Sequence, residues 1–252
     1  ALRYAALLFV VGTVLAILLP ARVDSSEGEQ PVDLTQIASG ASRPRGGKGI
    51  SITRGVVNGL RSNAGLRLLS GFLTIFMAFT LREPPESMGW GGSATILLGL
   101  VIGGAGAGNV LGVLIGSMTR SRKPQNVVIA VLVLDVAVVS VVAVLFTWWT
   151  VVLLGLTIGL CQSLGKLSLD ALIQNDVLEE VRTSMFARSE TLLQLSWVIG
   201  GLIGIGLFTI EATPRIGLLT IAAILLAWLA FVLTRARNEP ASRTREPAEV
   251  AD

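Results

Sequence analysis

Several side chains capable of acid–base chemistry lie inside long apolar stretches of this sequence. In the stretch 151–174, the polar residues Gln162, Lys166, Asp170 and Gln174 recur at intervals of four. That spacing places them on one stripe of a continuous helix. A charge inside a bilayer costs several kcal/mol and is seldom kept there without a use or a partner. We therefore expect this stripe to face other protein groups or a water-filled cavity.

Asp135 is a second candidate, because it falls near the middle of the apolar segment 127–146. The loss of water at that depth favours the neutral form of a carboxyl group that has no partner. Two interpretations stay open: Asp135 is a proton carrier, or it forms a structural ion pair with Lys166. In the first, a lysine between two carboxylates keeps one acid ionised and lets the other exchange a proton. The predicted proton-coupling residues are Asp135, Lys166 and Asp170.

Other polar side chains near these helices are candidates for a substrate cavity and for a gate. The cavity candidates are Asn109, Gln162 and Gln194, and the alternative role of Asn109 is a hydrogen bond between helices. At the inner ends of the helices we expect Glu190 and Arg188 to form a gating or solvated ion pair. The full set of cytoplasmic gate candidates is Arg120, Arg122, Lys123, Glu180, Arg182, Arg188 and Glu190.

The composition is that of an integral membrane protein. Hydrophobic residues make up 52% of the 252 residues and charged residues 15%, below the quarter that is usual in soluble domains. The apolar residues come in long runs, which predicts an all-α membrane protein with seven transmembrane helices, the last six forming one bundle. The expected spans are Tyr4–Pro20, Leu68–Leu81, Gly91–Met118, Val127–Phe146, Val151–Gln174, Ser189–Ile210 and Ile216–Leu233.

The distribution of basic residues predicts the orientation. If the loop after Pro20 is cytoplasmic, sixteen of the twenty Lys and Arg residues lie on the cytoplasmic side. The positive-inside rule then places Ala1 outside and the C-terminus inside, in the plasma (inner) membrane. The expected regions are a transmembrane helix (1–20), a cytoplasmic linker with a short amphipathic helix at 50–60 (21–65), the six-helix bundle (66–236) and a disordered cytoplasmic tail (237–252). Because Ala1 stands just before an apolar run that lacks a cleavage site, we expect the chain to start inside a longer polypeptide.

Several classes of function are excluded or disfavoured by what the sequence lacks. It has no histidine and one cysteine, Cys161, so a His/Cys zinc or haem site and an internal disulfide are excluded. Lys48 and Lys166 lack the context of a phosphate-binding loop, which leaves ATP-driven transport unsupported. We expect no enzymatic activity and no cofactor. The weak positive charge reflects loop asymmetry, so no nucleic-acid partner is expected.

Glycines recur at intervals of four in the third and sixth expected spans. Such small-residue faces let another helix approach closely in a membrane. We expect them to pack against partner helices that this chain does not supply. The residues are Gly104, Gly108, Gly112 and Gly116 in the third span, and Gly200 and Gly204 in the sixth.

Two local motifs and the order of the spans resemble the second half of a major facilitator superfamily transporter. The run GVLIGSMTRSRK (Gly112–Lys123) is similar to the family's cytoplasmic G-x-L-x-D-R-x-G-R-K signature, with Gly116 where the family has an acid. The run DVLEEVRTSMFAR (Asp176–Arg188) is similar to its P-E-x-x-R-x-x-x-F loop, with Leu178 in place of the proline. The first span then resembles the sixth helix of the family, and the other six its C-terminal bundle.

The resemblance implies alternating access around a cavity shared with an N-terminal half-transporter bundle. We expect proton-coupled export of small apolar or amphiphilic molecules, with the lipid bilayer, the N-terminal bundle, the substrate and protons as partners. Two alternatives remain: a non-transporting membrane assembly subunit, and a carrier for metabolite uptake.

Overall fold

The computed structural model describes residues 10–15, 17–18, 53–119 and 124–238, and within these ranges the chain is helical, with no strand. A short 3-10 helix, η2 (Glu86–Met88), lies in the connection between the first two long helices. The long helices are α3 (Arg54–Thr80), α4 (Ala94–Thr119), α5 (Pro124–Leu145), α6 (Trp148–Asp176), α7 (Glu179–Thr209) and α8 (Pro214–Asn238).

Each of these six helices is long and apolar enough to cross a membrane. The shortest, α5, has 22 residues, and about 20 suffice for a hydrocarbon layer of about 30 Å. They correspond to the last six of the seven expected spans. Most of the first expected span lies outside the described residues, although residues 10–15 are helical.

Local sequence signals set several helix ends. Pro124 and Pro214 stand at the first positions of α5 and α8, where a residue without a backbone N–H is tolerated. At the start of α6, the backbone N–H of Thr147 donates to Oγ1 of Thr150, 3.0 Å away. These signals set the residues at which α5, α6 and α8 begin.

The start of α3 differs from the expectation. A separate amphipathic helix was expected at 50–60, but from Arg54 onward these residues form the first turns of the same helix that crosses the membrane. Val56, Val57 and Leu60 are buried there, and two of them belong to a cluster with apolar residues of α5, α6 and α7. Burial against protein, rather than against a membrane surface, therefore extends the helix by several turns.

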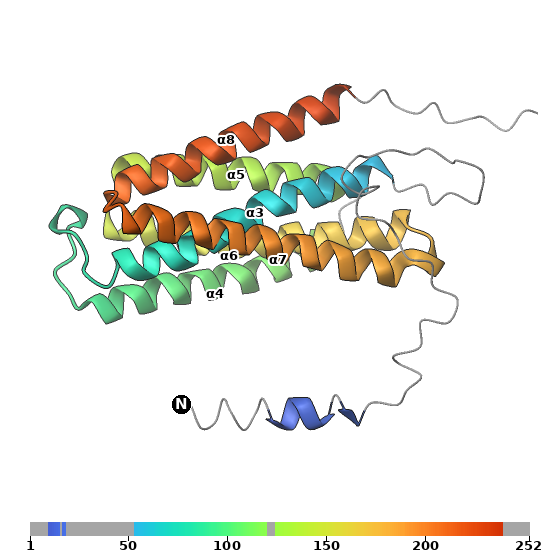
Figure 1. The fold of residues 1–252 in the computed structure, drawn as a ribbon, viewed down its shortest axis with the longest axis horizontal. Helices are drawn as coiled ribbons and strands as arrows, with labels where there is room; N and C mark the ends of the chain where they lie inside the picture. The colour runs from blue at the N-terminus through green and yellow to red at the C-terminus, as the bar shows by residue number, and fades with distance from the viewer. Residues whose placement is uncertain (1–9, 16, 19–52, 120–123, 239–252) are drawn as a thin grey trace, which may run out of the picture.

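The helices lie side by side in one bundle (Figure 1), with α3 in contact with α5, α6, α7 and α8. The α3–α4 and α7–α8 connections lie at one end, and the α6–α7 connection lies at the other. The most extensive helix pairs are α4 with α6 and α3 with α7. As a result, α4 and α7 each pack mainly against a single neighbour.

The α4–α6 pair crosses through glycines on both helices. A Cβ added to Gly108 would overlap the carbonyl oxygen of Leu156, and one added to Gly159 would overlap that of Ala105. Four other glycines lie on this contact. On α4, Gly104 faces Val152 and Leu156, Gly112 faces Leu160 and Ser163, and Gly116 faces Leu164 and Leu167. On α6, Gly155 faces Val101.

The α3–α7 pair also crosses through glycines. A Cβ on Gly200 would overlap the carbonyl oxygen of Leu68, and one on Gly204 would lie 3.0 Å from that of Phe72. The partners of both glycine faces are therefore helices of this chain. The expectation that an absent half supplies them is wrong, because periodicity shows which face is small but not which helix covers it.

Candidate functional site

Lys166 is the centre of an ionic cluster between α6 and α7. Its Nζ lies 2.8 Å from Oε2 of Glu190 and 3.3 Å from Oδ1 of Asp170, one turn further along its own helix. We call these three residues the ion cluster. Since α6 and α7 touch each other at few other places, the Lys166–Glu190 pair is the main polar connection between these two helices.

Polar groups from α3, α6 and α7 surround the ion cluster. Gln194 Nε2 donates to Glu190 Oε1 at 3.1 Å, and Gln162 Nε2 donates to the backbone oxygen of Leu66 at 2.6 Å. Arg67 of α3 is close enough to Glu190 to interact with it electrostatically. Three helices therefore meet at this cluster.

In a helix centred on a bilayer, the ion cluster would lie at a depth where the bilayer is apolar. With 29 residues, α6 is about 43 Å long, and Lys166 lies about 15 Å from its end at Asp176. A helix of this length extends about 7 Å beyond each side of a 30 Å hydrocarbon layer when it is centred. In that position the ammonium group would be within the apolar layer, where ion pairing with Glu190 and Asp170 would offset the loss of water.

Asp135 is not a member of the ion cluster, so the predicted pairing of Asp135 with Lys166 is wrong. Its side chain is fully buried in α5, and neither carboxyl oxygen accepts a hydrogen bond from the described residues. The nearby polar group is the thiol of Cys161 on α6. Cys161 precedes Lys166 by five residues, which is about 7 Å along the helix and a different face. The rotation of α6 about its axis directs Lys166 to Glu190 of α7 instead of to Asp135 of α5.

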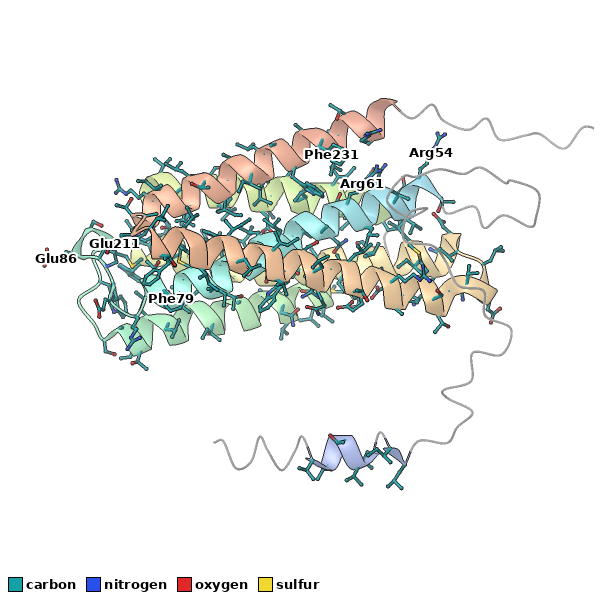
Figure 2. The ribbon with its side chains drawn as sticks, in the orientation of Figure 1. Arg54, Arg61, Phe79, Glu86, Glu211 and Phe231 are labelled. Carbon is teal, nitrogen blue, oxygen red and sulfur yellow. The ribbon has the colours of Figure 1, made fainter. Side chains whose placement is uncertain are left out.

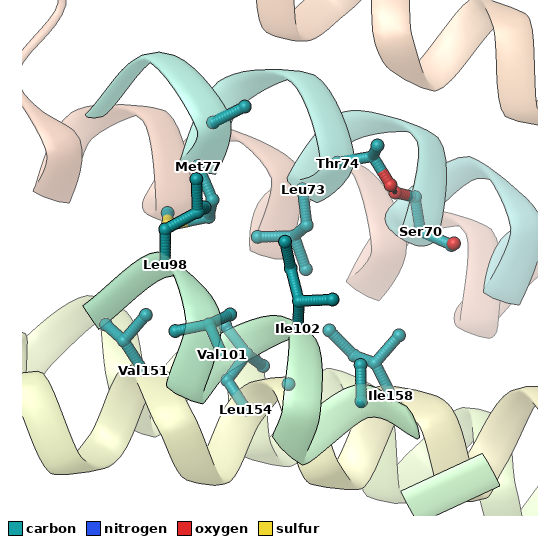
Figure 3. Close-up of a pocket in the computed structure, with 13 residues that line it drawn as sticks. Ser70, Leu73, Thr74, Met77, Leu98, Val101, Ile102, Val151, Leu154 and Ile158 are labelled. Carbon is teal, nitrogen blue, oxygen red and sulfur yellow. Dashed lines mark hydrogen bonds between the residues drawn. The ribbon is translucent and has the colours of Figure 1, made fainter. Parts of the chain in front are cut away.

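A cavity of about 330 Å³ lies between α3, α4 and α6 (Figure 3). Its walls are mostly apolar, and the two hydroxyl side chains among them are on α3. That volume and lining suit a small apolar molecule. The lining residues are Ser70, Leu73, Thr74, Met77 and Ala78 of α3, Leu98, Val101, Ile102 and Ala105 of α4, and Val151, Leu154, Gly155 and Ile158 of α6.

The cavity and the ion cluster share one face of α6. Ile158 lines the cavity, Gln162 follows four residues later, and Lys166 four residues after that. Residues spaced by four lie one above another on a helix. The eight residues from Ile158 to Lys166 span about 12 Å. The apolar cavity and the partly exposed ion cluster are thus close neighbours along a single stripe.

The other predicted site residues are scattered. The side chain of Asn109 is exposed on α4, and its backbone oxygen accepts a hydrogen bond from Ser163 Oγ at 3.0 Å. Arg182 donates to the backbone oxygen of Val177 at 3.3 Å. Glu190 pairs with Lys166 rather than with Arg188, which corrects the expected gate pair. Arg120, Arg122, Lys123 and the side chain of Glu180 lie outside the described residues.

Two residues of this region were missed in the sequence. Neither Arg67 nor buried Asn63 was among the predicted site residues; Asn63 Nδ2 donates to the backbone oxygen of Gly165 at 3.0 Å. A signal was present, because Asn63, Arg67 and Ser70 recur on one face of α3. Among the described residues, no group of three or more His, Cys, Asp or Glu side chains could hold a metal ion.

No protein-family model matches the chain, and no solved structure matches it. It is similar to the uncharacterized protein ML2143 of Mycobacterium leprae, with 31% identity over 253 residues that cover 95% of this chain and 42% of the relative. It is also similar to the uncharacterized protein Rv0876c of Mycobacterium tuberculosis, with 27% identity over 240 residues that cover 91% and 42%. The chain thus spans about two fifths of the length of these relatives.

Proposed function

We propose that the chain is one half of a proton-coupled secondary transporter that exports small apolar or amphiphilic molecules by alternating access. The observation that carries this proposal is the shared face of α6, where an apolar cavity stands next to a half-buried lysine held by two carboxylates. The cavity would take the apolar part of a substrate. The ion cluster would supply the titratable group.

The ion cluster can couple a proton to a movement of helices. If Glu190 takes up a proton, its carboxylate becomes neutral and its attraction for Lys166 falls, while Asp170 on the same helix keeps the ammonium paired. The link between α6 and α7 is then weakened. Release of the proton restores it, so the contact between the two helices depends on proton binding. This assignment replaces Asp135 by Glu190 in the coupling role.

The pairing of helices supports an internal repeat of the kind found in secondary transporters. If α3, α4 and α5 are matched in order with α6, α7 and α8, the contact of α3 with α7 corresponds to that of α6 with α4. Both pairs are the most extensive in the bundle, and both cross through glycines. Two three-helix units related by a two-fold rotation would produce this pattern.

The proposed location is the plasma (inner) membrane, with the C-terminus cytoplasmic. The end of the bundle with the α6–α7 connection carries Arg54, Arg182, Arg188 and Arg235 with Asp176 and Glu179, and the opposite end carries Arg82 and Arg215 with Glu83, Glu86 and Glu211. This asymmetry agrees with the positive-inside rule. The resemblance to the second half of a major facilitator transporter supports the same orientation and an N-terminal bundle as partner.

A second candidate function is that of a non-transporting assembly subunit. It is favoured by the exposed apolar faces of α4 and α7. In the most apolar 18-residue segment of each helix, only 17% (α4) and 22% (α7) of the residues are buried. Such faces can contact either lipid or another membrane protein. The two functions differ in whether the cavity is used, which an experiment can decide.

The test is export of the neutral apolar dye Nile red from cells that lack the gene and are complemented with variants. Ala78 lines the cavity and is exposed, so Ala78→Phe should fill the cavity without disturbing the core. We expect it to reduce export to the level of the deletion strain. Ala107→Phe, at an exposed position of α4 outside the cavity, should leave export unchanged. Equal export with and without the gene would favour the assembly role.

A further inference from the structure

The hydroxyl group of Ser70 differs from most hydroxyl groups in these helices. A serine or threonine inside a membrane helix commonly donates its proton to the backbone oxygen four residues earlier. Thr80 donates in this way to Phe76 at 2.8 Å, and Thr157 donates to Leu153 at 2.9 Å. The Ser70 hydroxyl makes no hydrogen bond with the described residues, so its donor is unused.

The acceptor that Ser70 would use within its own helix is occupied from another helix. The backbone oxygen four residues before Ser70 belongs to Leu66, and it accepts a hydrogen bond from Gln162 Nε2 of α6 at 2.6 Å. That bond takes one of the two lone pairs of the oxygen, and the Ser70 hydroxyl does not use the other. Gln162 lies on the same stripe of α6 as Lys166, so the stripe reaches α3 beside the cavity.

The unused hydroxyl belongs to the wall of the apolar cavity. Ser70 is half-buried and lines this cavity of about 330 Å³. The other hydroxyl side chain in the lining, Thr74, donates to the backbone oxygen of Ser70 at 2.7 Å, so its proton is already used. Figure 3 shows both residues on α3, with apolar side chains of α4 and α6 around the rest of the cavity. The cavity therefore offers a ligand one side-chain donor that no described residue engages.

The charge around the cavity favours an uncharged ligand. Among the residues that the structure describes, no charged side chain lines the cavity. Arg54 lies at one end of the bundle, and Glu86 and Glu211 lie at the other (Figure 2). An ionised ligand in the cavity would lose water without gaining a counter-charge, which is unfavourable. An uncharged acceptor loses less, and the Ser70 hydroxyl replaces its hydrogen bond to water.

We propose that Ser70 is a specificity-determining residue, which donates a hydrogen bond to an uncharged acceptor oxygen on an otherwise apolar molecule. A ketone, ester or ether oxygen meets this description. Gln162 is a positioning residue, because it occupies the Leu66 oxygen and leaves the Ser70 donor for the ligand. One well-placed polar group in an apolar pocket fixes the orientation and the specificity of a ligand. This inference rests on the proposed function, since it names the class of molecule that the same cavity binds.

The test compares 2-acetylnaphthalene with 2-ethylnaphthalene, which have the same shape and differ in one carbonyl oxygen. Binding to the purified protein in lipid nanodiscs is measured by equilibrium dialysis. Each ligand dissolves equally in the lipid around every variant, so differences between variants report the site. We expect Ser70→Ala to weaken binding of 2-acetylnaphthalene about fivefold, the effect of losing one hydrogen bond between uncharged groups. Its affinity for 2-ethylnaphthalene should stay within about twofold of that of the unmodified protein.

A second variant separates hydrogen bonding from a change in cavity shape. Gln162 does not line the cavity, and Gln162→Leu frees the Leu66 oxygen to accept from Ser70. We expect this variant to lose about threefold or more in affinity for 2-acetylnaphthalene and to bind 2-ethylnaphthalene normally. The control is Ser140→Ala on α5, outside the cavity, where the hydroxyl donates to the backbone oxygen of Val136 at 2.7 Å. It should bind both ligands as the unmodified protein does.

The proposal is overturned if Ser70→Ala weakens both ligands equally or neither, or if Gln162→Leu leaves the affinity for 2-acetylnaphthalene unchanged. It is also overturned if both ligands still bind to Ala78→Phe, since they would then bind outside the cavity. Tighter binding of 2-naphthoate than of 2-acetylnaphthalene would show that the site selects an anion. No proton gradient is present, so these outcomes do not depend on transport. Selective binding without export of Nile red would count against the proposed function alone.

Discussion

Lys166 is shared by two carboxylates from different helices, and the two contacts differ in geometry. The contact with Glu190 is a hydrogen-bonded ion pair at 2.8 Å, whereas Oδ1 of Asp170, at 3.3 Å, is near the ammonium but does not accept a hydrogen bond from it. Charge-assisted hydrogen bonds are the stronger kind. The inter-helix pair should therefore contribute more to stability than the pair within α6.

A double-mutant cycle with Lys166→Met and Glu190→Gln tests this. Because the two groups are in direct contact, the unfolding free energies should show a coupling of roughly 0.5–3 kcal/mol. The control cycle pairs Lys166→Met with Asp135→Asn and should show a coupling below about 0.5 kcal/mol. A larger coupling in the control cycle than in the Glu190 cycle would mean that Lys166 pairs with Asp135.

Asp135 is a buried acid without a hydrogen bond from the described residues, which is an unfavourable arrangement for stability. Replacing it by an apolar residue of similar size should remove a desolvation cost of about 1–3 kcal/mol. We expect Asp135→Val to raise the thermal unfolding temperature in detergent. Ser140→Ala on the same helix should not, because the Ser140 hydroxyl already donates to the backbone oxygen of Val136 at 2.7 Å. A lower unfolding temperature for Asp135→Val would show that the carboxyl group makes a stabilising contact.

At the scale of helices, the close crossing of α4 and α6 depends on residues without side chains. A Cβ on Gly108 meets the backbone of α6, which cannot move aside as a flexible side chain can. We expect Gly108→Ala to destabilise the protein by about 1–3 kcal/mol, the usual cost of overpacking. Gly106→Ala is the control, because nothing lies within 4 Å of its added Cβ; it should be neutral or stabilise by up to about 1 kcal/mol. Thermal unfolding of both variants checks this, and equal unfolding temperatures would argue against the crossing.

The sequence was sufficient to predict the helices but not how they pair. Long apolar runs identified α4 to α8, and four-residue spacing identified the polar stripe of α6. Whether Lys166 meets Asp135 or Glu190 depends on the rotation of α6 about its axis. Nearly every face of α6 is apolar, so periodicity does not define that rotation. The start of α3 was missed for a related reason, since Arg54 and Arg61 interrupt the apolar pattern while most of the residues between them are buried.

The whole molecule should cross the membrane six times over α3 to α8. Cysteines introduced at Ser87 and Glu179, both exposed at opposite ends of the bundle, test the orientation. Cys161 is buried and should not interfere. A membrane-impermeant maleimide should label Ser87→Cys in intact cells and Glu179→Cys only after the cells are opened. Labelling with the opposite pattern would reverse the proposed topology.

At the scale of the whole bundle, α6 connects the cavity, the ion cluster and the glycine crossing with α4. The cavity is bounded by α3, α4 and α6, and the ion cluster ties α6 to α7 beside it. A change in the Lys166–Glu190 contact therefore acts on a helix that also lines the cavity. This is why we assign proton coupling to Glu190, and why its neutralisation should affect transport more than binding.

The most direct measurement of this claim is proton-driven export of Nile red in cells that carry Glu190→Gln. We expect the variant to export the dye as slowly as unmodified cells treated with a protonophore, and to show no further loss when the protonophore is added. Glu86→Gln, an exposed acid in η2, should behave as the unmodified protein. If Glu190→Gln exports the dye at the normal rate and remains sensitive to the protonophore, the ion cluster is not the coupling site.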